Sequence, residues 1–203
     1  LHLQCHFGQD TLSLSRMGAK VTGIDLSDKA IKIAKELAKK LNADAEFICC
    51  DLYDLPNHLN KTFDIVFTSY GTIGWLPDLD KWAAVVSKFL KPGGKFVFAE
   101  FHPVVWMFDD AFEKIEYNYF KSEAIETLEG SYTESTTDLK QQFITWNHSL
   151  SEVLTSLLKQ GLQINSFYEY DYSPYNCFEK TIEFETNKFR IEHLGSNIPM
   201  VYS

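Results

Sequence analysis

Runs of consecutive apolar residues alternate, through the first half of the chain, with segments whose apolar residues recur every three or four positions. The consecutive runs predict strands at residues 1–3, 20–26, 45–50, 63–69 and 95–101. The helical spacing predicts a short helix that Asp10 caps and Gly18 ends, a helix over residues 28–41, and a helix that carries Trp82 and Phe89. Buried strands separated by helices are typical of a doubly wound α/β fold with a mostly parallel sheet, which binds ligands at the carboxyl ends of its strands.

The alternation stops at residues 104–148, which are aromatic and polar. We predict that these residues form an inserted, lid-like segment within a single domain of residues 1–203. Inside the segment, residues 115–119 and 143–145 show the alternation of strands, and Gly130-Ser131 marks a turn between them.

A helix returns after the insertion. Ser149 and Glu152 have the spacing of a capping box at its start, and Gly161 ends it. Residues 164–172 and 198–203 predict two last strands. Because the chain begins and ends inside predicted strands, we expect both of its ends to be trimmed.

Composition narrows the classes of function. The net charge is −9 at pH 7 and no Lys/Arg-rich run is present, which argues against a nucleic-acid partner. No apolar run is long enough for a membrane span and no secretory signal is found, so we expect no membrane partner. The four cysteines lack paired spacing, which favours a cytoplasmic protein. His2, Cys5 and His6 lie close together, but a second ligand pair is missing, so we predict no metal site.

Two acidic residues follow predicted strands at positions suited to a nucleotide-like ligand. Asp25 ends the second predicted strand, after a turn that contains Gly8, and a carboxylate there can bind a ribose diol. Asp25 could equally cap the next helix. Asp51 and Leu52 come at the end of the third predicted strand. The Asp51 carboxylate can accept a hydrogen bond from an adenine amino group. Its alternative role is that of an ordinary acid in a polar turn.

A third signal identifies a family. The run Phe63-Asp64-Ile65-Val66-Phe67, an amphipathic helix and then Leu90-Lys91-Pro92-Gly93-Gly94 resemble a class I S-adenosylmethionine-dependent methyltransferase of the small-molecule type. The resemblance covers roughly residues 1–102. It implies a Rossmann-like, seven-stranded sheet with a C-terminal antiparallel hairpin, and methyl transfer from S-adenosylmethionine to a small organic acceptor.

The resemblance also implies roles for residues at the strand ends. The loop from Gln4 to Gly8 would lie under the methionine part and the ribose, Asp25 would bind the ribose hydroxyls, and Ser69 and Tyr70 would flank the sulfonium. The full set implied to contact the cofactor is Gln4, Cys5, His6, Gly8, Asp25, Leu26, Asp51, Leu52, Ser69 and Tyr70.

The cofactor loop departs from the family pattern. The family usually has an acid and then two glycines where this chain has His2, Gln4 and His6. A side chain at a glycine position costs about 1 kcal/mol if the left-handed backbone is kept. The substitutions either weaken the binding of the cofactor or are tolerated, with Gln4 and His6 adding contacts. Since Gly8, Asp25 and Asp51 are present, we expect binding to be retained.

The acceptor site is expected from residues that follow the fourth and fifth strands and from the insertion. His102 is a candidate general base or substrate contact because imidazole titrates near neutral pH; a structural histidine in a strand-end turn is the alternative. Tyr70 is a second candidate catalytic residue. The remaining candidates for acceptor contact are Trp75, Trp106, Trp146 and His148, of which His148 also fits an ordinary residue beside a helix cap. Aromatic faces can hold a cationic or planar molecule, or can form the lid's own core.

Two other functions fit parts of the sequence. A nicotinamide-dependent oxidoreductase would explain Asp25, but not Asp51 or the Leu90–Gly94 segment. A catalytically degenerate methyltransferase fold, kept as a binding protein, would explain the altered loop. The acceptor and the oligomeric state are not readable from the sequence.

Overall fold

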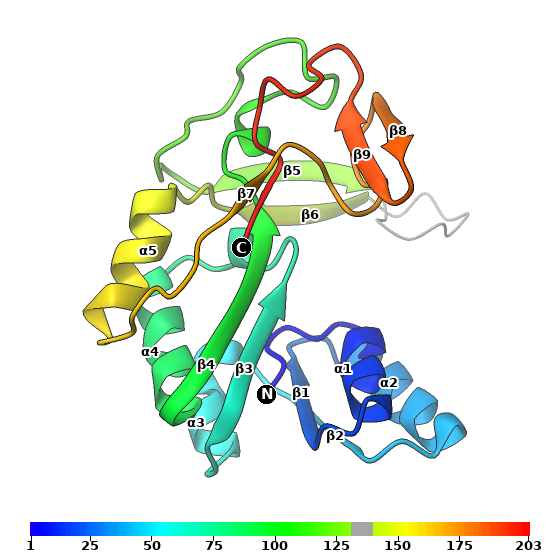
Figure 1. Ribbon diagram of the computed structural model, residues 1–203, viewed down its shortest axis with the longest axis vertical. Helices are drawn as coiled ribbons and strands as arrows, with labels where there is room; N and C mark the ends of the chain where they lie inside the picture. The colour runs from blue at the N-terminus through cyan, green and yellow to red at the C-terminus, as the bar shows by residue number, and fades with distance from the viewer. Residues whose placement is uncertain (131–139) are drawn as a thin grey trace. The chain divides into compact units, whose positions relative to one another are not determined.

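The computed structural model describes residues 1–130 and 140–203, and these residues separate into two units (Figure 1). The first unit consists of Leu1–Ser69, Asp80–Ala99 and Ser156–Gln163. The second unit consists of Tyr70–Leu79, Glu100–Thr155 and Ile164–Ser203. Each is described by itself below.

Parallel strand pairs form the sheet of the first unit. Strand β1 (Val21–Asp25) pairs in parallel with β2 (Ala45–Cys49), and β3 (Phe63–Ser69) pairs in parallel with β4 (Leu90–Phe101). His2 forms parallel bridges to Gly23 of β1 and to Phe67 of β3, which link the two pairs. The predicted parallel arrangement is therefore present across the strands whose carboxyl ends position the site.

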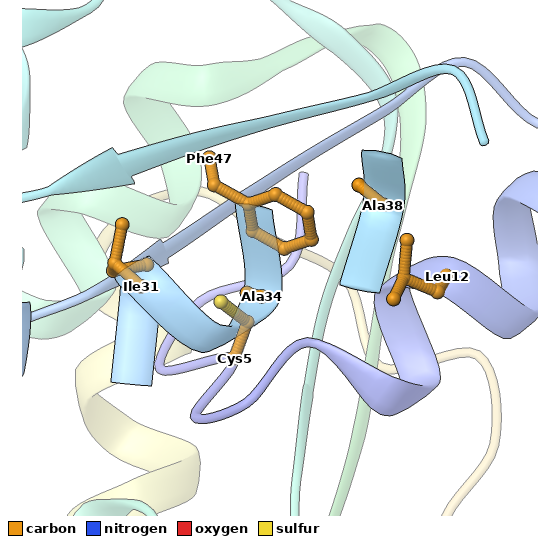
Figure 2. Packing of buried hydrophobic residues seen from close by; sticks show 6 residues of the cluster. All are labelled: Cys5, Leu12, Ile31, Ala34, Ala38 and Phe47. Atoms are coloured by element: carbon orange, nitrogen blue, oxygen red, sulfur yellow. The ribbon is translucent and has the colours of Figure 1, made fainter. Parts of the chain in front are cut away.

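Helices α1 (Gln9–Arg16) and α2 (Asp28–Leu41) pack on β1 and β2 (Figure 1). Their apolar residues form a core with the strands: Cys5, Leu12, Ile31, Ala34, Ala38 and Phe47 (Figure 2). The prediction that Asp10 caps α1 is wrong: the cap is Gly8, in a left-handed conformation, and Asp10 lies in the first turn. A carboxylate still stabilises that position because it faces the positive end of the helix dipole.

The helix before the Pro-Gly-Gly segment is α4 (Leu79–Phe89), and its buried face packs on β4. Trp82 is fully buried, and its ring centroid lies 5.6 Å from that of Phe96 and 5.4 Å from that of Phe98. Between β2 and β3 the chain forms a 3-10 turn (Leu52–Asp54) and the short helix α3 (Leu55–His58).

The second unit is built mainly from antiparallel pairs. The end of β4 pairs with β10 (Val201–Tyr202), which also pairs with β7 (Glu169–Tyr170). Strand β5 (Ile125–Gly130) pairs with β6 (Lys140–Thr145), and β8 (Thr181–Glu185) pairs with β9 (Lys188–Ile191). Helix α5 (Leu150–Lys159) begins in this unit, and two 3-10 turns (Ile73–Trp75 and Val105–Met107) lie in its loops.

The structure corrects the predictions for this second unit in part. The strand predicted at residues 115–119 is wrong: Ile115 forms only an isolated bridge with Phe108, and the N–H groups of Glu116 and Tyr117 both donate to the carbonyl of Met107. The last two strands are shorter than predicted, while β5, β8 and β9 were not predicted. Of the predicted turn, Gly130 ends β5 and Ser131 lies outside the described residues.

The fold is Rossmann-like with mixed strand directions, while the count of seven strands in one sheet stays a prediction. No helix among the described residues is both long and apolar enough to span a lipid bilayer.

Candidate cofactor and acceptor sites

The loop between residue 3 and α1 has left-handed backbone at alternate positions. The φ angles are 53° at Gln4, 49° at His6 and 71° at Gly8. The N–H of Cys5 donates to the Ile24 carbonyl at 2.8 Å, and the N–H of Gly8 donates to the Cys5 carbonyl at 2.8 Å. The loop therefore keeps a glycine-type conformation at two positions that carry side chains.

Gly8 is required at its position by space as well as by φ. A Cβ atom built there would lie 2.6 Å from Cε1 of Phe47, a buried side chain that cannot move away without disturbing the core. At Gln4 and His6 the left-handed backbone costs roughly 1–2 kcal/mol each. Of the three left-handed positions, Gly8 is therefore the one at which a side chain would collide with the core.

Asp25 holds this loop in place. Its Oδ2 accepts a hydrogen bond from the His6 N–H at 2.8 Å, and its Oδ1 accepts one from the Ser27 N–H at 2.9 Å. The cap of α2 is Ser27, whose hydroxyl accepts from the Ala30 N–H, so Asp25 does not cap the helix. Asp25 thereby joins the end of β1 to the strained loop.

The neighbouring residues offer a surface beside that carboxylate. Leu26, directly after β1, is 71% exposed, although leucine side chains are often buried. Asp51 is exposed, and its Oδ1 accepts from the Tyr53 N–H at 2.7 Å, as the polar-turn alternative describes. Leu52 is buried, so its predicted contact with the adenine edge stays a prediction. Ser69, at the end of β3, is half-buried.

These features form a test of fit for S-adenosylmethionine. A left-handed loop lets backbone approach a ligand closely, a fixed carboxylate suits a ribose diol, and an exposed leucine suits the face of an adenine ring. The residues Gln4–Gly8, Asp25 and Leu26 have these features and all belong to the first unit. Contact of the cofactor with these residues and with Asp51 stays a prediction. Burial raises the pKa of the Cys5 thiol to about 12, so Cys5 contributes backbone and packing but no thiolate.

His2 lies beneath the loop, where the family usually has an acid. It is buried, and its Nδ1 lies 2.7 Å from the hydroxyl of Thr11. Burial is the main cause that lowers the pKa of His2 to about 4, so the imidazole is neutral at pH 7. A neutral imidazole can pair with the hydroxyl through Nδ1 and leaves no buried charge.

A cluster of aromatic side chains lies in the second unit. Five rings contact one another around Phe101: we call this set, Tyr70, Phe101, Trp106, Tyr175 and Phe178, the aromatic wall. The centroid of the Phe101 ring lies 5.8 Å from Tyr70, 5.6 Å from Trp106, 6.0 Å from Tyr175 and 5.0 Å from Phe178. Phe101 is buried, whereas Trp106 is 37% and Tyr175 is 43% exposed. The wall thus combines a buried centre with two exposed rings.

Two of these residues, Tyr175 and Phe178, were not singled out in the sequence. They come from a loop of irregular pattern, and the aromatic residues clustered after Pro174 were the available signal. Trp75 and Trp146 lie elsewhere in the unit. Trp75 is 43% exposed and contacts Phe143 edge-on at 5.7 Å, and the N–H of Trp146 donates to the Gly74 carbonyl at 2.8 Å.

His102 is enclosed by protein groups. It is 3% exposed, and its Nδ1 accepts from the Val104 N–H at 3.2 Å, which places the ring proton on Nε2. That Nε2 lies 2.9 Å from Oε1 of Glu169, at ion-pair distance but without the angle of a good hydrogen bond. Burial lowers the pKa of His102, and the Glu169 carboxylate opposes that shift. His102 thus has one nitrogen hydrogen-bonded to backbone and the other at ion-pair distance from Glu169, which fits the structural alternative.

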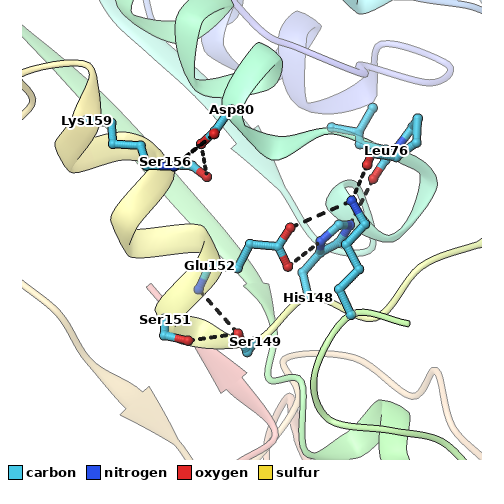
Figure 3. Close-up of polar contacts among 10 residues, drawn as sticks. Leu76, Asp80, His148, Ser149, Ser151, Glu152, Ser156 and Lys159 are labelled. Carbon is cyan, nitrogen blue, oxygen red and sulfur yellow. Dashed lines mark hydrogen bonds and ion pairs between the residues drawn. The ribbon is translucent and has the colours of Figure 1, made fainter. Parts of the chain in front are cut away.

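His148 is enclosed in a similar way (Figure 3). Its Nε2 donates to the Leu76 carbonyl at 2.8 Å, and its Nδ1 lies 3.1 Å from Oε2 of Glu152. The Ser149 hydroxyl accepts from the Glu152 N–H at 3.3 Å, so Ser149 caps α5. The arrangement matches the alternative in which His148 supports a helix start.

Known proteins match the first part of the chain in sequence. Residues 1–94 match the family described as "Methyltransferase domain". A sterol 4-C-methyltransferase from Caenorhabditis elegans is 28% identical over 99 residues, 48% of this chain and 29% of that protein. A ubiquinone biosynthesis O-methyltransferase from Idiomarina loihiensis is 29% identical over 99 residues, 49% of this chain and 40% of that protein. The chain thus spans less than half the length of these curated relatives.

The fold as a whole also has relatives. A solved structure of an S-adenosylmethionine-dependent methyltransferase from Clostridium acetobutylicum ATCC 824 superposes with a TM-score of 0.64. The superposition covers 100% of this chain and 82% of that one at 15% sequence identity. An identity that low establishes a shared fold only.

Proposed function

Since residues 1–94 belong to the methyltransferase domain family, we propose that this chain transfers the methyl group of S-adenosylmethionine to a small, neutral, planar organic acceptor. The methyl donor is the cofactor that the family resemblance implies. The acceptor is argued from the second unit, because most of the candidate residues for its binding lie after residue 94.

The observation that carries the choice of acceptor is the aromatic wall. All five of its side chains are uncharged, and Trp106 and Tyr175 expose large ring surfaces beside Phe101. A ring that stacks on such a surface gains about 0.5–1.5 kcal/mol beyond its burial. Tyr70 follows β3 and Phe101 ends β4, and the carboxyl ends of parallel strands are where ligands bind in this fold class.

The reaction requires alignment more than it requires a reactive side chain. The acceptor's lone pair forms a bond to the methyl carbon while the carbon–sulfur bond breaks and its electrons return to sulfur. The acceptor's proton passes to a base. We assign alignment to Tyr70 and Trp106 and assign the base to solvent water, because both nitrogens of His102 contact protein groups. Contacts of the acceptor with Trp75, Trp146 and His148 stay predictions.

The test measures S-adenosylhomocysteine released from S-adenosylmethionine. We expect release with 2-naphthol, a planar phenol, and much less with cyclohexanol, which has a hydroxyl but no flat face. Trp106→Ala should lower kcat/KM for 2-naphthol at least tenfold. The matched control is Phe120→Ala, an exposed aromatic outside the wall, which should leave kcat/KM within twofold.

Two results would contradict parts of the proposal. Equal turnover of 2-naphthol and cyclohexanol would remove the planar acceptor. A chain that binds neither S-adenosylmethionine nor S-adenosylhomocysteine in calorimetry would favour the degenerate binding protein. His102→Ala measured in the same assay tests the base: a loss of turnover with an unchanged fold would restore His102 as a catalytic candidate.

A further inference from the structure

Glu100 is an acidic residue buried near the end of β4. It is 1% exposed, and five donors surround its carboxylate. Its Oε1 accepts from the backbone N–H groups of Gly71 and Phe101, the latter at 2.7 Å. Its Oε2 accepts from the Thr72 N–H at 2.7 Å, the Thr72 hydroxyl at 2.9 Å and the Ile73 N–H at 3.2 Å.

The loop that supplies four of these five donors has an unusual backbone. Tyr70 and Gly71 are both left-handed, with φ angles of 42° and 70°. Three successive N–H groups, those of residues 71, 72 and 73, then point at one carboxylate. Successive N–H groups after a left-handed turn form a concavity that binds anions. Here the anion is a side chain of the same chain, so the concavity is filled from the neighbouring strand end.

The Glu100 carboxylate can stabilise this arrangement through its hydrogen bonds. A buried carboxylate is tolerated only when hydrogen bonds replace its water, and hydrogen bonds to an ionised acceptor are roughly twice as strong as neutral ones. Four such contacts hold a loop whose residue 70 has a side chain in a conformation that favours glycine. Glutamine would present two hydrogens of its own toward the same donors.

We propose that Glu100 is a positioning residue that holds the Tyr70 loop in its left-handed form and so places the Tyr70 ring in the aromatic wall. Tyr70 contacts the rings of Phe101 and Tyr175, at 5.8 and 5.9 Å. Phe101 is the residue after Glu100, so the same strand end fixes the loop and the centre of the wall. The inference rests on the proposed function only where it gives the wall the task of binding an acceptor.

The first test needs no acceptor. In Glu100→Gln, amide hydrogens of residues 71–73 should exchange with deuterium at least tenfold faster, while peptides of the first unit keep their rates. The matched control is Glu192→Gln, an exposed glutamate of the same unit, which should leave the 71–73 rates unchanged. Unchanged exchange at residues 71–73 in Glu100→Gln would overturn the proposal, as would faster exchange that is uniform over the chain.

A second variant covers the case in which Glu100→Gln does not fold. Thr72→Val removes only the hydroxyl donor and keeps the backbone donors. It should speed the exchange of residues 71–73 about threefold and leave other peptides unchanged; no local effect in this variant would also overturn the proposal.

The kinetic test separates positioning from general stability. With 2-naphthol as the acceptor, Glu100→Gln should raise the acceptor KM at least fivefold, and by a larger factor than it raises the KM of S-adenosylmethionine. In a Tyr70→Ala background the same substitution should have no further effect on the acceptor KM, because the two residues act through one contact. Additive effects would overturn the proposal. Absence of turnover with every planar acceptor would count against the proposed function alone, since the exchange result does not depend on it.

Discussion

Gln4 and His6 keep the backbone of a glycine loop although both carry side chains. Their φ angles of 53° and 49° are close to the 71° of Gly8. Asp25 stabilises this conformation by accepting the His6 N–H. The loop therefore keeps the backbone geometry of a glycine loop. We expect any change in cofactor affinity to come from the side chains of Gln4 and His6.

We expect Gln4→Gly and His6→Gly each to raise the free energy of unfolding by up to about 1 kcal/mol, because relief of left-handed strain exceeds the entropy that glycine adds to the unfolded chain. Urea denaturation measures the change. Lys35→Gly, in the middle of α2, is the control and should lower stability by about 1 kcal/mol. A loss of stability in both loop variants would show that the side chains make contacts worth more than the strain.

His2 makes stability depend on pH. Its pKa is about 4 in the folded chain against the model-peptide value of 6.5, so the unfolded chain binds a proton first as the pH falls. The contribution is present in full above pH 6.5 and is lost progressively toward pH 4. We expect His2→Asn, which keeps a polar group beside Thr11 but does not titrate, to flatten the fall in unfolding free energy in that window by about 2–3 kcal/mol. Identical pH profiles of the two proteins would contradict this.

At the scale of elements, α5 begins with a modified capping box. Ser149 caps the helix as the sequence predicts, but the Glu152 side chain lies beside His148 and Lys121, with Oε2 3.1 Å from the His148 ring and Oε1 3.8 Å from the Lys121 amine. His148 also bonds the carbonyl of Leu76. His148 thus holds the start of α5 to the loop of residues 70–79. From the sequence it fits only an ordinary residue beside a helix cap.

The separate Ser156–Asp80 and Lys159–Asp80 contacts link the later part of α5 to α4 in the first unit (Figure 3). Lys159 and Asp80 are both more than half exposed, so solvent screening makes their pair worth little. The buried His148 contact therefore matters more to stability than the exposed pair.

We expect His148→Ala to lower the free energy of unfolding by about 2–3 kcal/mol, because it removes a buried ring and leaves the Leu76 carbonyl without its donor. Ser149→Ala should lower it by about 1 kcal/mol through loss of the cap. Thermal and urea denaturation measure both changes. Thr155→Ala, at an exposed position of the same helix, is the control and should not lower stability, because alanine has the higher helix propensity. A smaller effect at His148 than at Ser149 would contradict this ranking.

At the scale of the whole molecule, we propose that the first unit binds the cofactor and that the second unit binds the acceptor. Residues 1–94 match the methyltransferase domain family that the sequence resembles, and methyl transfer from S-adenosylmethionine is the activity that we propose. The aromatic wall lies in the second unit, and four of its five residues lie beyond the family match. Affinity for the cofactor and affinity for the acceptor should therefore respond to different substitutions.

Calorimetry with S-adenosylhomocysteine checks this division. Asp25→Ala should lower the affinity at least tenfold, because it removes both the carboxylate for the ribose and the acceptor that holds the His6 N–H. Trp106→Ala should leave the affinity within twofold while it raises the acceptor KM. Equal losses in the two variants would mean that the units do not bind their ligands separately.

Local pattern was sufficient for the elements of the first unit. The predicted 28–41 helix and 63–69 strand agree with α2 and β3, because the spacing of apolar residues within one short segment is a local signal. The predictions for residues 104–203 were less accurate. The alternation at residues 115–119 comes from side chains held by distant partners, such as Tyr119, whose hydroxyl accepts from the Leu150 N–H.

The sequence by itself thus determined the parallel strand–helix order and the resemblance of residues 1–94 to a methyltransferase domain, because periodicity and short motifs are local properties. Tertiary structure alone decided that Gln4 and His6 keep left-handed backbone, that Tyr175 and Phe178 join Phe101, and that Glu100 holds the loop after β3. Each of these depends on groups far apart in the chain, whose meeting is set by the packing of the whole fold and leaves no periodic signal in the sequence.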